Sequence, residues 1–194
     1  MVTINEVRIV DVMTFTLEPA APFAQQLNLL IMKATFDVAN EWFFFDGAHS
    51  AASSLEQGMS NTWLHESFVA ANEKHEIFAY FEGQWMRPMD IITGFRTIHF
   101  GVQYSHMWTK AIFAYFDYLF VNRGCMAFNW SVAHQNKHAM EQYERFVRDY
   151  CGHKVGIRHY AQKSYTGKIS DITLYEMTSE EYFDWKGRKF RRRL

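Results

Sequence analysis

The chain has few of the residues that break a fold or staple it covalently. Its 194 residues include two cysteines, three prolines and ten glycines. The cysteines, Cys125 and Cys151, form no C-x-x-C pair, so the sequence indicates neither a disulfide framework nor a cysteine-built metal site. With so few prolines and glycines, no linker divides the chain, and its length favours one domain with its own core.

Long apolar runs are also missing. The most apolar stretch, 111–121, contains Asp117 and has about half of the roughly 20 residues that a membrane-spanning helix needs. The first residues carry early charges and lack the apolar region of a signal peptide. We therefore expect a cytoplasmic protein, located in the host cytoplasm if the chain is viral.

The net charge of −1 conceals an asymmetry between the body of the chain and its end. Removing six cations of the last nine residues leaves 14 basic residues (20 − 6) against 21 acidic ones, or about −7. An acidic body argues against a nucleic-acid-binding surface there, and the basic segment alone suits RNA or an acidic partner. We expect one domain over 1–183 and a basic C-terminal tail over 184–194, which contains Lys186, Arg188, Lys189, Arg191, Arg192 and Arg193.

Aromatic residues are abundant, at 18% of the chain, and ten methionines accompany them. This composition favours a bulky core, and it also suits an aromatic-lined cleft or an adhesive surface. A homodimer is compatible with such a surface.

The apolar periodicity predicts an alternation of strands and helices. Helices are expected over 21–39, from Ser53 or Ser54 to 72, and over 109–121 and 136–150. Strands are expected over 7–12, 75–81, 85–89, 90–100, 125–132 and 170–177, with Glu82-Gly83 as a hairpin turn. This order implies an α/β domain with a mixed sheet, and the strand–helix–strand portion over 90–132 predicts a parallel pair.

Two patterns near the C-terminus carry the functional information. A buried strand runs into Asn136, with Ala139 and Tyr143 three and seven residues further on, and a later turn and strand read G-x-x-x-D-x-x-L-Y from Gly167. This spacing resembles the C-terminal half of the GCN5-related N-acetyltransferase (GNAT) superfamily, and within it the branch that acetylates ribosomal-protein N-termini. The aromatic, methionine-rich composition is similar to that of divergent phage-encoded members. The resemblance implies a single-domain fold with a mixed, mostly antiparallel sheet, a splayed parallel strand pair and helices on both faces.

The resemblance also implies an activity, the transfer of an acetyl group from acetyl-CoA to a primary amine. The amine would belong to a protein N-terminus, a lysine or a small molecule, and no metal is implied. Backbone amides at the end of strand 93–100 would hold pantetheine and polarise the thioester, at Ile98, His99, Phe100 and Gly101.

Two residues of the helix after the last parallel strand have implied roles. Asn136 would bridge the strand end and the cofactor, and it also suits an ordinary helix N-cap. Tyr143 would protonate the departing thiolate, and a tyrosine that only packs against the core or the cofactor is the other interpretation.

The pyrophosphate loop departs from the family pattern. Gln103 takes its first position, but His106 and Trp108 stand where glycines are usual, and Met107 and Thr109 complete the segment. Glycines there let the backbone approach phosphate at a helix N-terminus, where free amides favour anions. The bulky replacements, the aromatic content and the basic tail support an alternative: a catalytically inactive acetyltransferase-fold protein that acts in assembly or protein interaction.

A general base is not singled out. Candidates are His99, Glu41 and Glu66, although His99 shares a strand face with Phe95 and Thr97 and suits a rim or core histidine as well. A metal face of two histidines and one carboxylate, His134, His138 and Glu141, is disfavoured because His134 precedes the expected helix. No P-loop pattern is present.

Overall fold

The protein forms one seven-stranded mixed sheet in the order β1-β2-β3-β4-β5-β7-β6. The computed structural model describes residues 15–35, 65–86, 89–100, 105–164 and 166–191. Within these residues β4 and β5 pair in parallel, and every other neighbouring pair is antiparallel. The expected α/β fold with one parallel pair is therefore confirmed. The strands are β1 (Phe15–Pro19), β2 (His65–Asn72), β3 (Ile77–Met86), β4 (Ile91–His99), β5 (Ala127–Ala133), β6 (His153–Lys163) and β7 (Ile169–Thr178).

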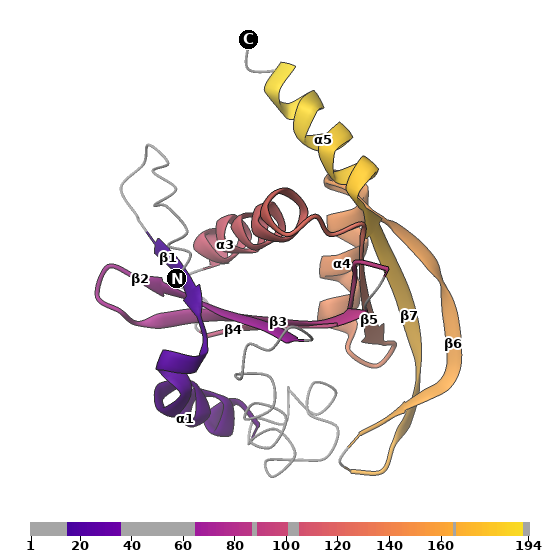
Figure 1. Ribbon diagram of the computed structural model, residues 1–194. Helices are drawn as coiled ribbons and strands as arrows, with labels where there is room; N and C mark the ends of the chain where they lie inside the picture. The colour runs from indigo at the N-terminus through magenta and orange to yellow at the C-terminus, as the bar shows by residue number, and fades with distance from the viewer. Residues whose placement is uncertain (1–14, 36–64, 87–88, 101–104, 165, 192–194) are drawn as a thin grey trace.

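Helices cover both faces of the sheet (Figure 1). Helix α1 lies on one face, and α3 and α4 lie on the other. No helix in the described part of the chain is long and apolar enough to cross a membrane. The helices are α1 (Ala24–Thr35), α3 (Ser105–Asp117), α4 (Lys137–Asp149) and α5 (Ser179–Arg191), and a π-helical turn (Tyr118–Asn122) continues α3.

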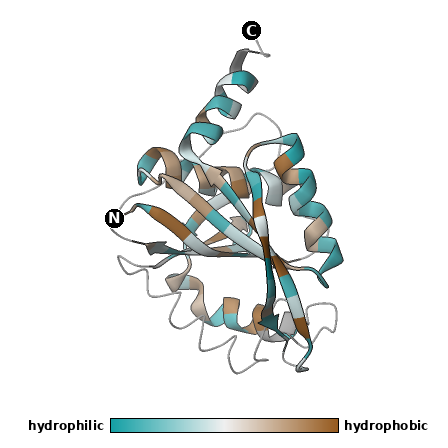
Figure 2. Ribbon diagram, turned by 90° about the vertical axis from the view of Figure 1, so that its right-hand side faces the viewer, coloured by the Kyte–Doolittle hydropathy of each residue, from teal (hydrophilic) through white to brown (hydrophobic). Residues whose placement is uncertain are grey.

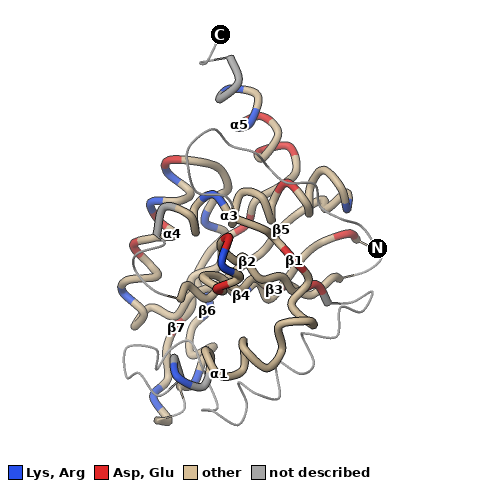
Figure 3. Tube along the Cα trace, turned by 90° about the vertical axis from the view of Figure 1, so that its left-hand side faces the viewer, with Lys and Arg blue, Asp and Glu red and all other residues tan. Residues whose placement is uncertain are grey.

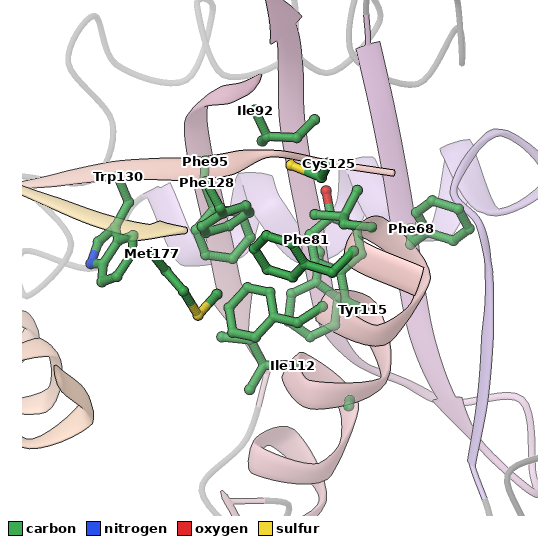
Figure 4. Packing of buried hydrophobic residues seen from close by; sticks show 14 of the residues in the cluster. Phe68, Phe81, Ile92, Phe95, Ile112, Tyr115, Cys125, Phe128, Trp130 and Met177 are labelled. Carbon is green, nitrogen blue, oxygen red and sulfur yellow. The ribbon is translucent and has the colours of Figure 1, made fainter. Parts of the chain in front are cut away.

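Two hydrophobic cores hold these layers together. The larger one lies between the sheet and α3, where aromatic rings from several elements meet (Figure 4). The ring of Tyr115 stacks on Phe81 at 5.4 Å, and the edge of Phe116 meets Phe128 at 4.9 Å. Such offset and edge-to-face pairs add to the burial of apolar area. The smaller core packs α1 against the opposite face of β2 and β3.

The predicted helix from Ser53 or Ser54 to 72 is wrong over its last eight residues, because 65–72 forms strand β2. Strand β2 lies between β1 and β3, and Phe68, Val69, Ala70 and Ala71 are all buried. A strand covered on both faces has no polar–apolar alternation, so its apolar run resembled a helix face. Residues 53–64 and the strand expected over 7–12 lie outside the described part of the chain.

The hairpin turn predicted at Glu82-Gly83 is also wrong, because β3 continues through it. A Cβ atom on Gly83 would lie 2.6 Å from Ile92 Cγ2, so this glycine permits the close approach of β4. Glu82 is buried, accepts a hydrogen bond of 2.6 Å from the Tyr80 hydroxyl and pairs with Arg96 on β4. The dipeptide is therefore part of the sheet's interior.

Three elements were missed: β1, β6 and α5. The edge strand β6 is exposed along most of its length, and hydrophobic and hydrophilic residues alternate along the outer strands (Figure 2). Helix α5 begins with a capping box, in which the Thr178 hydroxyl accepts from Glu181 N and the Glu181 carboxylate accepts from Thr178 N. Helix α5 crosses position 184, where the basic tail was expected to begin.

Candidate functional site

Strands β4 and β5 are paired over a very short distance. Ile91 faces Ala127 and Ile92 faces Phe128, and in the described residues no further ladder pair joins the two strands. Strand β4 continues to His99 and β5 to Ala133, so a long edge of each strand has no strand partner in the part of the chain that the structure describes. An extended ligand with amide groups can add to such an edge as an extra strand does.

A β-bulge marks the point where β4 parts from β5. Two residues of β4, Gly94 and Phe95, oppose the single residue Gly83 on β3, and Gly94 has a φ of +62°. A bulge of this kind bends the strand and increases its twist. The bend follows directly after Ile92, the last β4 residue that pairs with β5.

The register of β4 determines which of its amides face the opening. The Phe100 N–H donates to Phe78 O at 2.8 Å, so this amide faces β3. Because successive residues of an antiparallel strand point their N–H groups to alternate sides, Ile98 also faces β3, and Thr97 and His99 face the opening. Of the expected amide donors, His99 is therefore well placed, and the amides of Ile98 and Phe100 are committed to the sheet. Gly101 lies outside the described residues.

Helix α3 begins beside this open edge. The Trp108 indole Nε1 donates to Thr97 Oγ1 at 3.2 Å, and its ring lies 6.3 Å from the His99 ring. The indole thus lies against the outer half of β4. Met107 is buried, and Thr109 is partly buried. Gln103 and the side chain of His106 lie outside what the structure describes.

Helix α4 carries the other two candidate residues. The Asn136 side chain caps the helix by accepting from Ala139 N at 3.2 Å, so the N-cap interpretation is confirmed. Tyr143, two turns further on, packs against Trp130 of β5 at 5.9 Å and Tyr175 of β7 at 6.0 Å. Burial raises the pKa of Tyr143 to about 12, so its hydroxyl is protonated throughout the neutral range.

The base candidates are dispersed. His99 is the last residue of β4 and lies beside the opening. Glu66 lies on β2 and pairs with Arg123 at 2.7 Å, which follows the π-helical turn. The Arg123 guanidinium also lies 5.7 Å from the ring of Trp85, whose β4 partner Ile92 is at the paired end of that strand, so Glu66 serves a structural ion pair. Glu41 lies outside the described residues.

A polar network that the sequence did not reveal joins the start of α4 to the outer strands. The Asp171 carboxylate of β7 accepts from Tyr160 N at 2.9 Å and lies 2.8 Å from His159 Nδ1. The Asp171 carbonyl accepts from His134 N, and the His134 ring lies 2.8 Å from the Thr173 hydroxyl. The described residues contain no cluster of three metal-binding side chains, and His134 is engaged by β7 instead.

The Asp171 carboxylate also fixes a distortion of β6. The pairing register shifts between Arg158 and Gln162, and Tyr160 within this bulge has a φ of +52° and is 83% exposed. The only sequence signal for the contacts of Asp171 with β6 was its place in the G-x-x-x-D pattern. That pattern predicted a turn and a strand, and it did not predict these contacts.

One buried polar atom near the opening has no hydrogen-bond partner among the described residues. The Nε1 atom of Trp130 is buried, and no atom in the described part of the chain accepts a hydrogen bond from it. Trp130 lies two residues beyond Phe128, where β5 has parted from β4. An unpaired strand edge with a nearby orphan donor fits an extended ligand that carries carbonyl groups.

No protein-family model matches the sequence, and no curated protein matches it. Solved structures do match. The ribosomal-protein-S5-alanine acetyltransferase from Vibrio fischeri is 13% identical with a TM-score of 0.68, covering 89% of this chain and 99% of that one. A spermidine N-acetyltransferase from Vibrio cholerae, in complex with CoA and spermine, is 13% identical with a TM-score of 0.64 over 87% of this chain and 98% of that one.

A further structure of the spermidine/spermine enzyme of Vibrio cholerae, in complex with manganese ions, gives the same picture. It is 14% identical with a TM-score of 0.64, over 88% of this chain and 95% of that chain. At such low identity the likeness concerns the fold alone. The chain has the fold of the GCN5-related N-acetyltransferases.

Proposed function

We propose that this protein transfers an acetyl group from acetyl-CoA to a primary amine. The observation that carries the proposal is the opening between β4 and β5, where two strands of one sheet share only two residue pairs and then part. The likeness to N-acetyltransferases across most of the chain, one of them in complex with CoA, supports it. The alignment covers 98% and 99% of the chains of those two proteins.

The open edge of β4 holds the pantetheine arm in this proposal. The amides of Thr97 and His99 face the opening and pair with the arm, and the His99 amide polarises the thioester carbonyl. The first turn of α3, from His106 to Thr109, and Gln103 before it hold the pyrophosphate through backbone amides. The Trp108 indole N–H donates to the Thr97 hydroxyl, so it is not available to the pyrophosphate. The backbone amides of the turn are the groups that bind the anion in this proposal.

The chemical step is a direct attack. The neutral amine nitrogen attacks the thioester carbonyl carbon, and the carbon–sulfur bond breaks as the carbon–nitrogen bond forms. The Tyr143 hydroxyl donates its proton to the leaving sulfur, and the nitrogen returns a proton to the tyrosine. Because the pKa of Tyr143 is about 12 and that of a thiol is about 8.5, donation to a free thiolate is unfavourable. The transfer is therefore concerted with bond cleavage.

The acceptor class is a protein N-terminus, a lysine or a small amine. One structural neighbour is named for the alanine of ribosomal protein S5 and another for spermidine and spermine. A peptide with N-terminal alanine and a polyamine therefore represent the two classes of acceptor. Incubation with acetyl-CoA and mass spectrometry of each acceptor tests the transfer. A gain of one acetyl group that requires the protein supports the proposal.

Binding of acetyl-CoA is the more general test. At a ligand concentration 100 times the Kd, binding adds about 2.7 kcal/mol of stability. For a chain of 194 residues this corresponds to a Tm increase of roughly 5–10 °C. A protein with neither a Tm increase nor calorimetric heat is the inactive scaffold instead, an alternative that the bulky Trp108 at a glycine position favours.

A further inference from the structure

The indole of Trp130 is placed where the opening begins. Strand β5 leaves β4 after Phe128, and Trp130 is the next residue on the same face of the sheet. Its side chain is 4% exposed and lies beneath α4, within the larger core. The ring therefore belongs to the core and lies at the point along β5 where the two strands have parted.

Aromatic rings surround the indole without satisfying it. Tyr175 stacks on it at 5.5 Å, Phe146 meets it edge-on at 6.1 Å and Tyr143 lies at 5.9 Å. Yet the described residues offer no hydrogen-bond acceptor to Nε1. Figure 4 shows the ring nitrogen turned away from Phe95 and Phe128. Buried tryptophan N–H groups usually have a partner, so an orphan one calls for an explanation.

The chemistry of the indole restricts what its partner can be. An indole N–H only donates, so its partner must be an acceptor such as a carbonyl oxygen. The arm of an acyl-CoA carries two amide carbonyls and one thioester carbonyl. We propose that the Trp130 N–H donates a hydrogen bond to a carbonyl oxygen of this arm, an inference that rests on the proposed function.

The indole nitrogen has no contact with solvent in the ligand-free protein, so a neighbour must move when the ligand binds. Tyr143 and Phe146 are the partly buried neighbours on α4, and Tyr143 is also the proposed proton donor.

The Trp130→Phe variant tests the inference, because it removes the N–H and keeps an aromatic ring. The loss of one net hydrogen bond is expected to weaken acetyl-CoA binding about 3- to 10-fold in calorimetry. The affinity for adenosine 3′,5′-bisphosphate, which lacks the pantetheine arm, is expected to stay unchanged. Trp85→Phe is the matched control, since it makes the same change at a buried tryptophan of β3 and should leave both affinities unchanged.

A second measurement needs no variant. Wild-type protein labelled with ¹⁵N-tryptophan contains six indole groups. The N–H resonance that is missing from the spectrum of Trp130→Phe is expected to move downfield with acetyl-CoA but not with adenosine 3′,5′-bisphosphate. Equal acetyl-CoA affinity in Trp130→Phe and wild type overturns the inference, as do six indole resonances that respond alike to both ligands. If wild-type protein binds neither ligand, the proposed function itself has failed.

Discussion

At the scale of single residues, the surroundings of Tyr143 set the pH behaviour of the proposed reaction. The residue must be protonated to donate, and burial raises its pKa to about 12. We therefore expect kcat to show no fall between pH 8 and pH 10 that is due to this group. A pH–rate profile at saturating acetyl-CoA measures it, and a descending limb centred in that range would contradict the assigned role.

Tyr143→Phe is expected to lower kcat about 100-fold because it removes the proton donor and keeps the ring. Its packing against Trp130 and Tyr175 should persist, so the KM for acetyl-CoA should change little. Steady-state kinetics and a thermal melt of the same preparation check both expectations. Unchanged turnover across the pH range would leave Tyr143 as a packing residue.

Asp171 supports a prediction about acid stability. The Tyr160 N–H, followed by the His159 ring, lowers the pKa of Asp171 below its ordinary value of 3.8. A carboxylate with a lowered folded-state pKa stabilises the protein above its ordinary pKa and loses this effect as the pH falls through the lowered value. Asp171→Asn is therefore expected to have a lower urea midpoint than wild type at pH 7, with the difference shrinking below pH 4.

Urea unfolding at pH 7, 5 and 3 measures this difference. Asp184→Asn is the control, because it removes one carboxylate from an exposed pair with Arg188 on α5. A difference between Asp171→Asn and wild type that is independent of pH would mean that the carboxylate charge does not hold the β6 bulge.

At the scale of elements, two glycines with opposite surroundings give predictions of opposite sign. Gly152 has a φ of +92°, and a Cβ there would lie 2.8 Å from Glu176 O. Gly152→Ala is expected to cost about 2–3 kcal/mol, from backbone strain and the clash. Gly187 lies inside α5, and no atom of the described residues lies within 4 Å of its Cβ position, so Gly187→Ala should add up to about 1 kcal/mol. Chemical denaturation of both variants checks the signs.

Elements with a regular apolar pattern or a local cap could be predicted from the sequence. Elements whose residues are determined by contacts with other strands or helices could not. Strand β5 alternates and α4 has its Asn136 cap, so both were found. Strand β2 was mistaken for a helix because both of its faces are covered. Gly83 was mistaken for part of a turn. A glycine is needed there because Ile92 of the neighbouring strand lies so close, and no local sequence pattern shows a contact between strands.

At the scale of the whole molecule, the sheet consists of two halves joined by two residue pairs and a bridging core. Phe116 of α3 contacts Phe95 of β4, Phe128 of β5, Phe146 of α4 and Tyr182 of α5. Phe116→Ala is expected to cost about 3–5 kcal/mol because it empties the centre of this bridge. Phe183→Ala, at an exposed ring on α5, should stay within about 0.5 kcal/mol of wild type.

Urea unfolding followed by both fluorescence and circular dichroism checks this prediction. Coincident transitions in wild type mean that the halves unfold together. A separate early transition in wild type would show that the bridge does not couple them.

The candidate site could be predicted only in part. The resemblance pointed to Asn136 and Tyr143, which lie at the N-cap and in the middle of α4, and to the strand that carries His99; their roles in binding and catalysis stay predictions. It did not show which amides of β4 face the opening, because that depends on the pairing register with β3. Nor did it show the orphan N–H of Trp130, which depends on how α4 packs over β5.

Helix α5 points away from the body, and its cations follow the acidic residues of its first turn (Figure 3). The chain thus separates six positive charges in its last nine residues from a remainder of about −7 (14 − 21). Within the described residues, Lys186, Arg188, Lys189 and Arg191 follow Glu180 and Glu181 along α5, so the helix has an acidic start and a basic far end. Such a molecule rotates in the field of a polyanion so that its C-terminal end arrives first, and added salt slows the encounter.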